Sequence, residues 1–361
     1  MKIALIGGVY GKSEVFRRKL QMTPETVLEE GLVGRGHQVA TFSHYAQVDG
    51  RSFQIVHVHH LSYGSIRAAT DDTSAAFVYT NHDLGAMTRK LDMRRRAAAR
   101  FVMSRADAVV ALSVPEADFQ TRNYPLAGAL RAIIPNGVEA KNYCYARHNL
   151  ASKGAPWRLL YVGQLVPVKN VDVLLRAVAR IERPVELQLV YHNAALEVPL
   201  RKLASELGLS ERVSFMGSKS PGELAPIYQC ADVFVLPSAS EALPSVVTEA
   251  MLCGTPVVAT DVGGVRDQLG GYGVCVPSGC PSVLAAAISR MLDQYSRFAE
   301  QGIAASAYAR ERFSIKNMVD RHLELYAALL EREGPRRRHS GLHQHFNTVL
   351  KMGVNLACIA K

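Results

Sequence analysis

The sequence predicts an α/β protein built from two doubly wound parallel sheets, and three observations favour this fold class. Short apolar, β-branched runs recur along the 361 residues and alternate with amphipathic segments, which is the pattern of parallel sheets with crossover helices. The same set of runs occurs once in each half of the chain, so we expect two sheets. The length also exceeds what one hydrophobic core usually serves.

The elements follow in order along the chain. Thr23 is a plausible N-cap and Pro24 a first helical residue, another helix begins near Pro244, and apolar residues at helical spacing predict a long amphipathic helix over 313–331. The predicted strands are 2–6, 37–42, 54–59, 77–82, 107–112 and 131–135 in the first half, and 158–163, 186–191, 212–217, 232–237, 255–260 and 273–277 in the second.

Composition narrows the class of protein. With 48% hydrophobic and 20% charged residues the chain reads as a globular protein, and it has no apolar run of about 18 residues that would span a bilayer. The N-terminal "MKIALIGGVYGK" predicts a first strand and not a signal peptide. Six cysteines without a CxxC pair indicate a reduced, cytoplasmic chain.

The formal net charge of +10 suggests an acidic partner, namely nucleotide phosphates, an anionic membrane surface or nucleic acid. Much of it lies in 88–105 and 331–345, where a solvated surface explains it equally well. The basic segments lack the interleaved aromatic residues of an RNA-binding module, so we expect no nucleic-acid partner.

The domain boundary is expected in the polar stretch 145–157, which carries Gly and Pro and has no periodicity. This gives domains at 1–148 and 149–312, followed by the helix at 313–332 and a tail at 333–361. Parallel sheets bind ligands at the carboxyl ends of their strands. The polar residues and glycines at those ends are Gly7, Gly8, His57, His59, His60, Asn81, His82, Asp83, Gly163 and Ser238 to Glu241.

Two carboxylates, Glu241 and Glu249, lie in an apolar segment on either side of the helix start near Pro244. A helix N-terminus is an anion site, since its unpaired N–H groups converge there. Buried carboxylates are costly unless a donor satisfies them. Hydroxyls on both flanks of a nucleotide sugar's diphosphate would satisfy both carboxylates.

Several motifs, in order, resemble the retaining glycosyltransferases of family 4. The segment "SEALPSVVTEAMLCGTPVVATDVGGVRDQL" resembles their donor site, and "LEEGLVGRGHQV", "TNHDL", "IPNGVE" and "YVGQLVPVKNVDVLLRA" resemble other family segments. The resemblance implies the GT-B fold, in which two Rossmann-like domains face a central cleft. It also implies an N-terminal acceptor-binding domain and a C-terminal nucleotide-sugar-binding domain. The final helix, 313–332, would cross back and pack on the N-terminal domain.

Carried over by position, the resemblance implies roles for single residues. Glu241 would hold donor-sugar hydroxyls, Glu249 the ribose, and the amides of Ala242, Leu243, Pro244 and Ser245 (Pro244 itself lacks an N–H) the diphosphate or sugar. Lys169 would neutralise the departing diphosphate, as a fixed cation stabilises growing negative charge, and His82 would lie near the reacting carbon. The expected catalytic residues are Lys169, Glu241 and His82, and the expected substrate-binding residues are Gly8, Gly163, Gln164, Ala242, Leu243, Pro244, Ser245 and Glu249.

Three departures from the family pattern stand out. Position 164 is Gln where the family usually has Arg, so charge stabilisation would rest on Lys169, the helix end, or another cation such as Arg266 or Lys153. The family's glycine pair is missing from the start of the first helix. Gly7 and Gly8, directly after the first strand, are candidates for a role related to that of the missing pair. The usual Gly after "VKN" is also missing.

The expected activity is metal-independent, retaining transfer from a UDP-, GDP- or ADP-sugar to a hydroxyl of a sugar, lipid or small molecule, without a cofactor. Three alternatives remain: a phosphate-loop NTPase, a nucleotide-sugar epimerase, and a non-catalytic nucleotide-sugar-binding relative. The first is disfavoured because "GGVYGKS" has one residue fewer between its glycines than the phosphate-loop motif requires. The tail 333–361 would either lie on an anionic membrane surface, at the inner face, or pack on the domain or be partly disordered.

Overall fold

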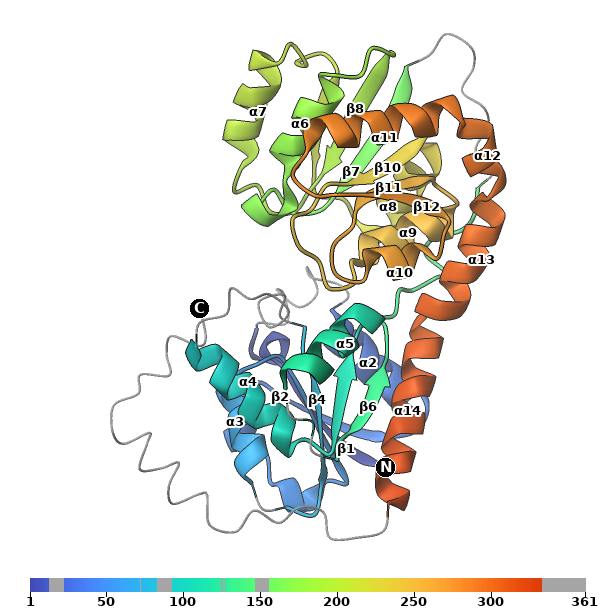
Figure 1. Ribbon diagram of the computed structural model, residues 1–361. Helices are drawn as coiled ribbons and strands as arrows, with labels where there is room; N and C mark the ends of the chain where they lie inside the picture. Colours follow the sequence, from blue (N-terminus) through green and yellow to red (C-terminus); the bar gives the residue numbers. More distant parts are fainter. Residues whose placement is uncertain are drawn as a thin grey trace. The chain divides into compact units, whose positions relative to one another are not determined.

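The computed structural model describes residues 1–12, 23–71, 73–82, 93–124, 126, 128–146 and 156–332. The chain forms two compact units (Figure 1). Unit 1 comprises Met1–Gly137 and the chain from Ile315 onward, and unit 2 comprises Val138–Ser314. Each unit holds one six-stranded parallel sheet. The predicted α/β class is therefore confirmed, and every predicted run contains a strand.

The sheet of unit 1 has the strand order β2-β1-β3-β4-β5-β6. Every residue of β3 and β4 is buried, because helices cover both faces of a parallel sheet and leave its central strands no solvent face. The strands are β1 (Lys2–Ile6), β2 (Gln38–Phe42), β3 (Ile55–His59), β4 (Ala76–Thr80), β5 (Ala108–Ala111) and β6 (Leu130–Ile133).

Two apolar cores lie on the two faces of this sheet, one under α3 and α4 and the other under α2 and α14. Thr23 caps α2 and Pro24 is its first residue, as predicted. Figure 1 draws α14 beside α2, and the helices touch at Gly31, where a Cβ would overlap the Val319 side chain. The helical elements are η1 (Gly8–Gly11), α2 (Pro24–Gly34), η2 (Tyr45–Gln47), η3 (Gly50–Ser52), α3 (Tyr63–Thr70), α4 (Met93–Arg105), α5 (Val114–Asn123) and α14 (Ile315–Glu331).

The sheet of unit 2 has the order β12-β11-β10-β7-β8-β9. Read from β9, this is the order of a dinucleotide-binding sheet, with its switch point between β7 and β10. The strands are β7 (Trp157–Val162), β8 (Val185–Val190), β9 (Val213–Gly217), β10 (Val233–Leu236), β11 (Val257–Thr260) and β12 (Gly273–Val276).

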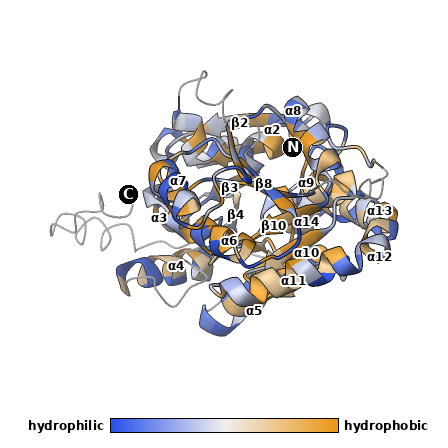
Figure 2. Cartoon of the chain, turned by 90° about the horizontal axis from the view of Figure 1, so that it is seen from above, coloured by the Kyte–Doolittle hydropathy of each residue, from blue (hydrophilic) through white to orange (hydrophobic). Residues whose placement is uncertain are grey.

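Several helices of unit 2 are amphipathic, α6, α7 and α11 among them, and Figure 2 shows both hydrophilic and hydrophobic residues along α11. Such helices bury one face against the sheet and leave the other in solvent. They are η5 (Pro167–Lys169), α6 (Val171–Val178), α7 (Glu197–Glu206), α8 (Pro221–Cys230), α9 (Ser245–Cys253), α10 (Val265–Leu269), α11 (Pro281–Asp293), α12 (Tyr295–Glu300) and α13 (Gly302–Phe313).

The division between the units falls after Gly137, ahead of the boundary that the sequence suggested at 148/149. The reason is that the segment after Gly137 bonds to the rest of unit 2: the Val138 amide donates to the Phe313 carbonyl, 2.8 Å away, and the Ala146 amide to the Cys253 carbonyl, 3.2 Å away. The helix expected at 313–332 is α14, which belongs to unit 1. The tail 333–361 lies outside the described residues. No helix within the described ranges is long and apolar enough to cross a membrane.

Candidate active site

The candidate site of unit 2 lies at the switch point of its sheet. Gly163 and Gln164 follow β7, and Ser238 to Glu241 follow the neighbouring strand β10. Because β7 and β10 are parallel, their carboxyl ends lie at one edge of the sheet, where open α/β sheets bind ligands.

Glu241 and Lys169 form an ion pair at this edge. Lys169 Nζ lies 2.6 Å from Glu241 Oε1, and the Ser238 hydroxyl donates to the same oxygen, also at 2.6 Å. The Glu241 side chain is only 6% exposed, so these charge-assisted bonds meet the desolvation cost of its carboxylate. Within the described ranges, no donor of the protein reaches the second oxygen, Oε2.

A polar network that the sequence reading did not identify holds this pair in place. The hydroxyls of Thr260 and Ser278 donate to the Ser238 carbonyl at 2.6 and 3.0 Å, and the Asn170 amide donates to the Ser278 hydroxyl at 3.3 Å. The Ala239 amide bonds to the Val168 carbonyl at 2.8 Å, which ties the Lys169 segment to the loop after β10. Thr260 could have been identified from the sequence, because it is the last residue of a predicted strand and such strand ends face the site.

The segment Ala242 to Ser245 leads into α9, whose N-cap is Pro244, close to the predicted helix start. The loop after β11 clamps this segment from the other side. Gly263 has a φ of +55°, and a Cβ there would overlap the Glu241 carbonyl. The Gly264 amide bonds to the Ala242 carbonyl at 2.9 Å. Glycine at 263 is thus required both by its backbone angle and by the close approach of the two loops.

Glu249 lies further along α9, and its partners are tyrosines. The Tyr228 hydroxyl donates to Glu249 Oε2 at 2.9 Å. Burial raises the pKa of Glu249 to about 7, although hydrogen bonds from Tyr228 and Tyr143 act in the opposite direction. Donors of the protein therefore reach at least one oxygen of each carboxylate, Oε1 of Glu241 and Oε2 of Glu249. That hydroxyls of a nucleotide sugar also bind these two carboxylates stays a prediction.

Gln164 makes contacts with two neighbouring side chains, those of His192 and Tyr161. Its side-chain amide nitrogen lies 3.2 Å from His192 Nε2, and the Tyr161 hydroxyl donates to the backbone carbonyl of Gln164 at 2.8 Å. Gly163 packs so closely on Tyr161 that a Cβ would lie 2.6 Å from the Tyr161 hydroxyl. Of the two substitute cations, Arg266 pairs with Asp261 at 2.6 Å, and Lys153 lies outside the described residues.

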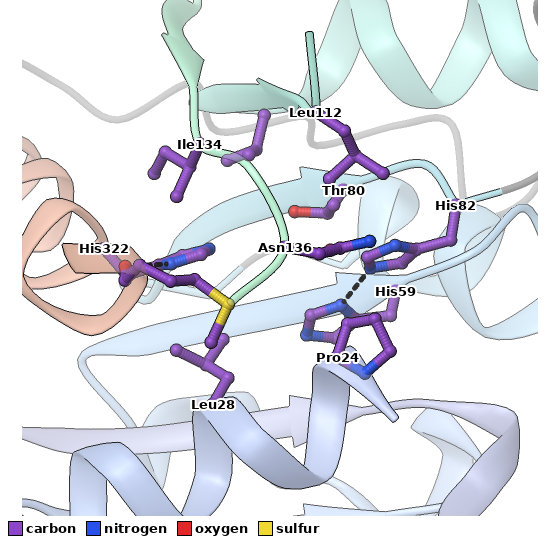
Figure 3. A pocket seen from close by; sticks show the side chains of 11 residues that line it. Pro24, Leu28, His59, Thr80, His82, Leu112, Ile134, Asn136 and His322 are labelled. Carbon is purple, nitrogen blue, oxygen red and sulfur yellow. Dashed lines mark hydrogen bonds between the residues drawn. The ribbon is translucent and has the colours of Figure 1, made fainter. Parts of the chain in front are cut away.

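In unit 1 the histidines at the strand ends come together. His59 Nδ1 lies 3.0 Å from His82 Nε2, and the two rings stack at 5.2 Å (Figure 3). Behind them, His57 bonds to the hydroxyls of Tyr326 and Thr80, both at 2.7 Å. Burial lowers the pKa of both His57 and His59 well below the usual value for histidine, so these rings are neutral at pH 7.

Two further residues complete the description of this edge of unit 1. Gly8 begins η1, and a Cβ there would meet no atom within 4 Å, so packing does not explain a glycine at this position. Asp83 lies outside the described residues.

His322 of α14 reaches the same edge, and the sequence reading missed it. It is buried beside Met318 and Tyr326 of its own helix. The available signal was a histidine on the apolar face of the predicted helix. Within the described ranges, no group of three or more His, Cys, Asp or Glu side chains is arranged to hold a metal ion.

Sequence comparison relates both halves of the chain to glycosyltransferases. The sequence profile described as "Glycosyltransferase Family 4" matches residues 40–142, and that described as "Glycosyl transferases group 1" matches residues 146–312. The chain is 30% identical over 328 residues to a D-inositol 3-phosphate glycosyltransferase of Corynebacterium urealyticum, covering 82% of this chain and 76% of the relative. It is 31% identical to the enzyme of that name from Geodermatophilus obscurus, covering 79% and 69%.

Solved structures show the same fold. Sucrose-phosphate synthase from Thermosynechococcus elongatus superposes with a TM-score of 0.77 at 22% identity, covering 91% of this chain and 99% of that one. Anabaena Alr3699/HepE in complex with UDP gives a TM-score of 0.73 at 20% identity, covering 91% and 100%. The chain therefore belongs to glycosyltransferase family 4, as a glycosyltransferase of the GT-B fold.

Proposed function

We propose that this glycosyltransferase moves a sugar from a nucleoside-diphosphate sugar to a hydroxyl of a sugar, lipid or small-molecule acceptor, with retention of anomeric configuration and without a metal ion. The observation that carries the proposal is Glu241, whose Oε1 is fixed by Lys169 and Ser238 while Oε2 is left for a ligand. A buried carboxylate oriented in this way is suited to accept hydrogen bonds from sugar hydroxyls.

The donor class has independent support from the structural relatives. Anabaena Alr3699/HepE has been solved with UDP and with UDP-glucose. In this chain, Glu241 would hold hydroxyls of the donor sugar and Glu249 those of the ribose. The N-terminal end of α9, at Ala242 to Ser245, would meet the diphosphate or the sugar, since helix N-termini favour anions.

The leaving group determines the role of Lys169. Departure of a nucleoside diphosphate builds negative charge, and a cation already held in place stabilises that charge most in the transition state. Lys169 and the end of α9 supply this stabilisation in our proposal, which is why no metal is invoked. In the proposed reaction His82 would lie beside the donor sugar, and the acceptor would attack from the face that the leaving group vacates.

The proposal is tested by binding first and chemistry second. UDP-, GDP- and ADP-glucose are compared by thermal shift, since a ligand at 100 times its dissociation constant stabilises the fold by about 2.7 kcal/mol. The product of transfer is then analysed by NMR for its anomeric configuration, with and without EDTA. A Glu241→Gln variant should stay folded and lose at least about tenfold in kcat/KM, because it loses a charged acceptor. An inverted product, loss of activity in EDTA, or no stabilisation by any nucleotide sugar would contradict the proposal.

A further inference from the structure

A small pocket lies at the carboxyl edge of the unit 1 sheet, and its polar lining is mostly imidazole. His59, Thr80, His82, Asn136 and His322 line it, together with apolar side chains of α2, β5 and α14. Figure 3 shows His322 on one side of the pocket and the bonded pair His59 and His82 on the other. It has room for about one water-sized group. The position suits a ligand, since it lies at the ends of parallel strands.

Two buried nitrogens that line this pocket have no hydrogen-bond partner among the residues that the structure describes. They are Nε2 of His59 and Nε2 of His322, whose residues are 3% and 4% exposed. Buried polar atoms are rarely left unsatisfied, because the loss of a hydrogen bond to water is costly. These two nitrogens are therefore open to a hydrogen bond with a ligand or a water.

The hydrogen-bonding role of His322 is fixed by its other nitrogen. Nδ1 lies 2.8 Å from the Met318 carbonyl oxygen, which can only accept, so Nδ1 carries a proton. Burial lowers the pKa of His322 to about 4, despite this bond, and the ring is neutral at pH 7. In a neutral ring with a proton on Nδ1, Nε2 is a bare acceptor. The group that meets His322 must therefore donate a hydrogen.

His59 offers the complementary role. Its Nδ1 shares one proton with His82 Nε2, at 3.0 Å. When His82 donates, His59 Nε2 carries a proton and points a donor at the pocket. A hydroxyl then satisfies both nitrogens, since it donates to His322 Nε2 and accepts from His59 Nε2. When His59 donates instead, both nitrogens accept, and only water, with two hydrogens, satisfies them.

The surrounding charge disfavours an anion. Although burial opposes its ionisation, the hydrogen bond from His60 holds the pKa of Glu25 well below its usual range. The buried carboxylate of Glu25, 2.7 Å from His60 Nε2, is therefore ionised. Glu25 does not line the pocket, but its negative charge lies near His59 and His82, which do. This charge and the lone pair on His322 Nε2 both repel a phosphate oxygen.

We propose that this pocket binds a single uncharged hydroxyl group, supplied by water in the free protein and by a sugar or polyol acceptor during transfer, and that it rejects phosphate. The inference rests on the proposed transferase function for the identity of the acceptor. It differs from what the names of the relatives suggest, because a phosphorylated acceptor would have to place its phosphate elsewhere and present an uncharged hydroxyl here.

The first test is a crystal structure of the full chain at a resolution that orders buried water, determined alone and after soaking with myo-inositol, D-glucose or inorganic phosphate. The expected result is one ordered oxygen within hydrogen-bond distance of both Nε2 atoms, and its replacement by a hydroxyl of a soaked polyol. An empty pocket, or phosphate in it, overturns the proposal. Water that stays in place with every polyol overturns the acceptor role.

The second test uses His322→Leu, which removes the acceptor nitrogen, with Tyr326→Phe as the control. Tyr326 lies on the same helix and bonds to His57, but it does not line the pocket. Loss of one hydrogen bond to the acceptor should raise the acceptor KM about tenfold in His322→Leu, while Tyr326→Phe leaves it within about twofold. Stabilisation by the nucleotide sugar should be unchanged in both. Loss of that stabilisation in wild type would count against the transferase proposal alone, whereas an unchanged acceptor KM in His322→Leu would overturn the pocket assignment.

Discussion

At Glu241, two donors converge on one carboxylate oxygen, and this convergence orients the whole group. Lys169 and Ser238 both bond to Oε1, while the Ser238 backbone is held by Thr260 and Ser278. A carboxylate fixed in this way needs little reorganisation when a ligand arrives, and preorganised polar groups are the largest source of transition-state stabilisation in many enzymes.

Lys169→Ala should lower kcat more than it weakens donor binding, because the diphosphate charge that Lys169 meets grows as the bond to the sugar breaks. A decrease of about a hundredfold in kcat is expected for the loss of one preorganised charge. The measurement is steady-state kinetics with varied nucleotide sugar, and Lys169→Arg, which keeps the charge, is the control. Weaker binding at unchanged kcat would show that Lys169 anchors the ground state only.

Gln164→Arg is the companion variant, since it restores the cation that the family usually has at this position. Raised kcat in Gln164→Arg would show that the neutral amide is a simple loss of charge. Lost activity would show that the contact between Gln164 and His192 is needed as it stands.

Donor affinity should depend on pH through Glu249. The pKa of Glu249 is raised to about 7, so the carboxylate form, which accepts hydroxyl hydrogens most strongly, predominates above pH 7 and is lost as the pH falls through it. We expect affinity for UDP-glucose, measured by calorimetry, to weaken by about tenfold from pH 8.5 to 5.5, as for loss of a charged hydrogen bond. The diphosphate of UDP-glucose stays ionised over this range, so it adds no pH dependence of its own.

Tyr228→Phe provides the control for that pH dependence. It removes a donor that lowers the pKa of Glu249, so the midpoint should move to higher pH. Tyr295→Phe, a second buried tyrosine whose hydroxyl faces Asp232 instead, should leave the midpoint in place. A midpoint that is equal in all three proteins would show that Glu249 does not contact the donor.

At the scale of elements, the start of α9 depends on the loop after β11. In Gly263→Ala, an added Cβ would overlap the Glu241 carbonyl, and the φ of +55° is itself unfavourable. We expect a loss of at least about 2 kcal/mol of stability, or a Tm lower by roughly 4 °C or more, together with loss of transfer because Glu241 is displaced.

Gly208→Ala separates these two effects. Gly208 has a similar φ of +71°, but no atom lies within 4 Å of its added Cβ. This control should cost about 1 kcal/mol and keep full activity. Equal losses of stability and activity in both variants would show that the backbone angle, and not the contact with Glu241, accounts for the effect.

The sequence predicted elements better than it predicted contacts. The strands and the starts of α2 and α9 follow from local patterns, namely apolar period, capping residues and proline at the first turn. The partner of Glu241 could not be read in this way, because Lys169 lies 72 residues away along the chain. Only the strand order, with β7 beside β10, brings the two loops together.

The histidines of unit 1 illustrate the same limit. His59 and His82 were predicted at neighbouring strand ends from topology alone, and the structure brings them within hydrogen-bond distance. His322 was missed because it lies on a helix from the other end of the sequence. The packing of α14 on unit 1 determines its position, and no short-range pattern encodes that packing.

At the scale of the whole molecule, the excess positive charge is concentrated in part at the end of the chain. The segment 334–361, outside the described residues, carries Arg336, Arg337, Arg338, Lys351 and Lys361 and no acidic residue, which is five of the net +10. Next to these charges lies the apolar stretch "VLKMGVNLACIA". Basic residues beside an apolar segment are attracted to anionic lipid surfaces, with about 1 kcal/mol for each Lys or Arg near the surface.

We therefore expect the full chain to bind vesicles that contain anionic lipid, and deletion of 334–361 to weaken this binding by at least about tenfold, equivalent to about 1.4 kcal/mol. Sedimentation with anionic and with neutral vesicles, at low and at high salt, measures it, because screening by salt should remove the electrostatic part of the attraction. Replacing Arg336, Arg337 and Arg338 with Ala in the full chain separates charge from the apolar stretch: most of the loss should already appear in this variant. Equal binding with and without the tail at low salt would end the membrane hypothesis. The transferase proposal would stand, because it depends only on residues within the two units.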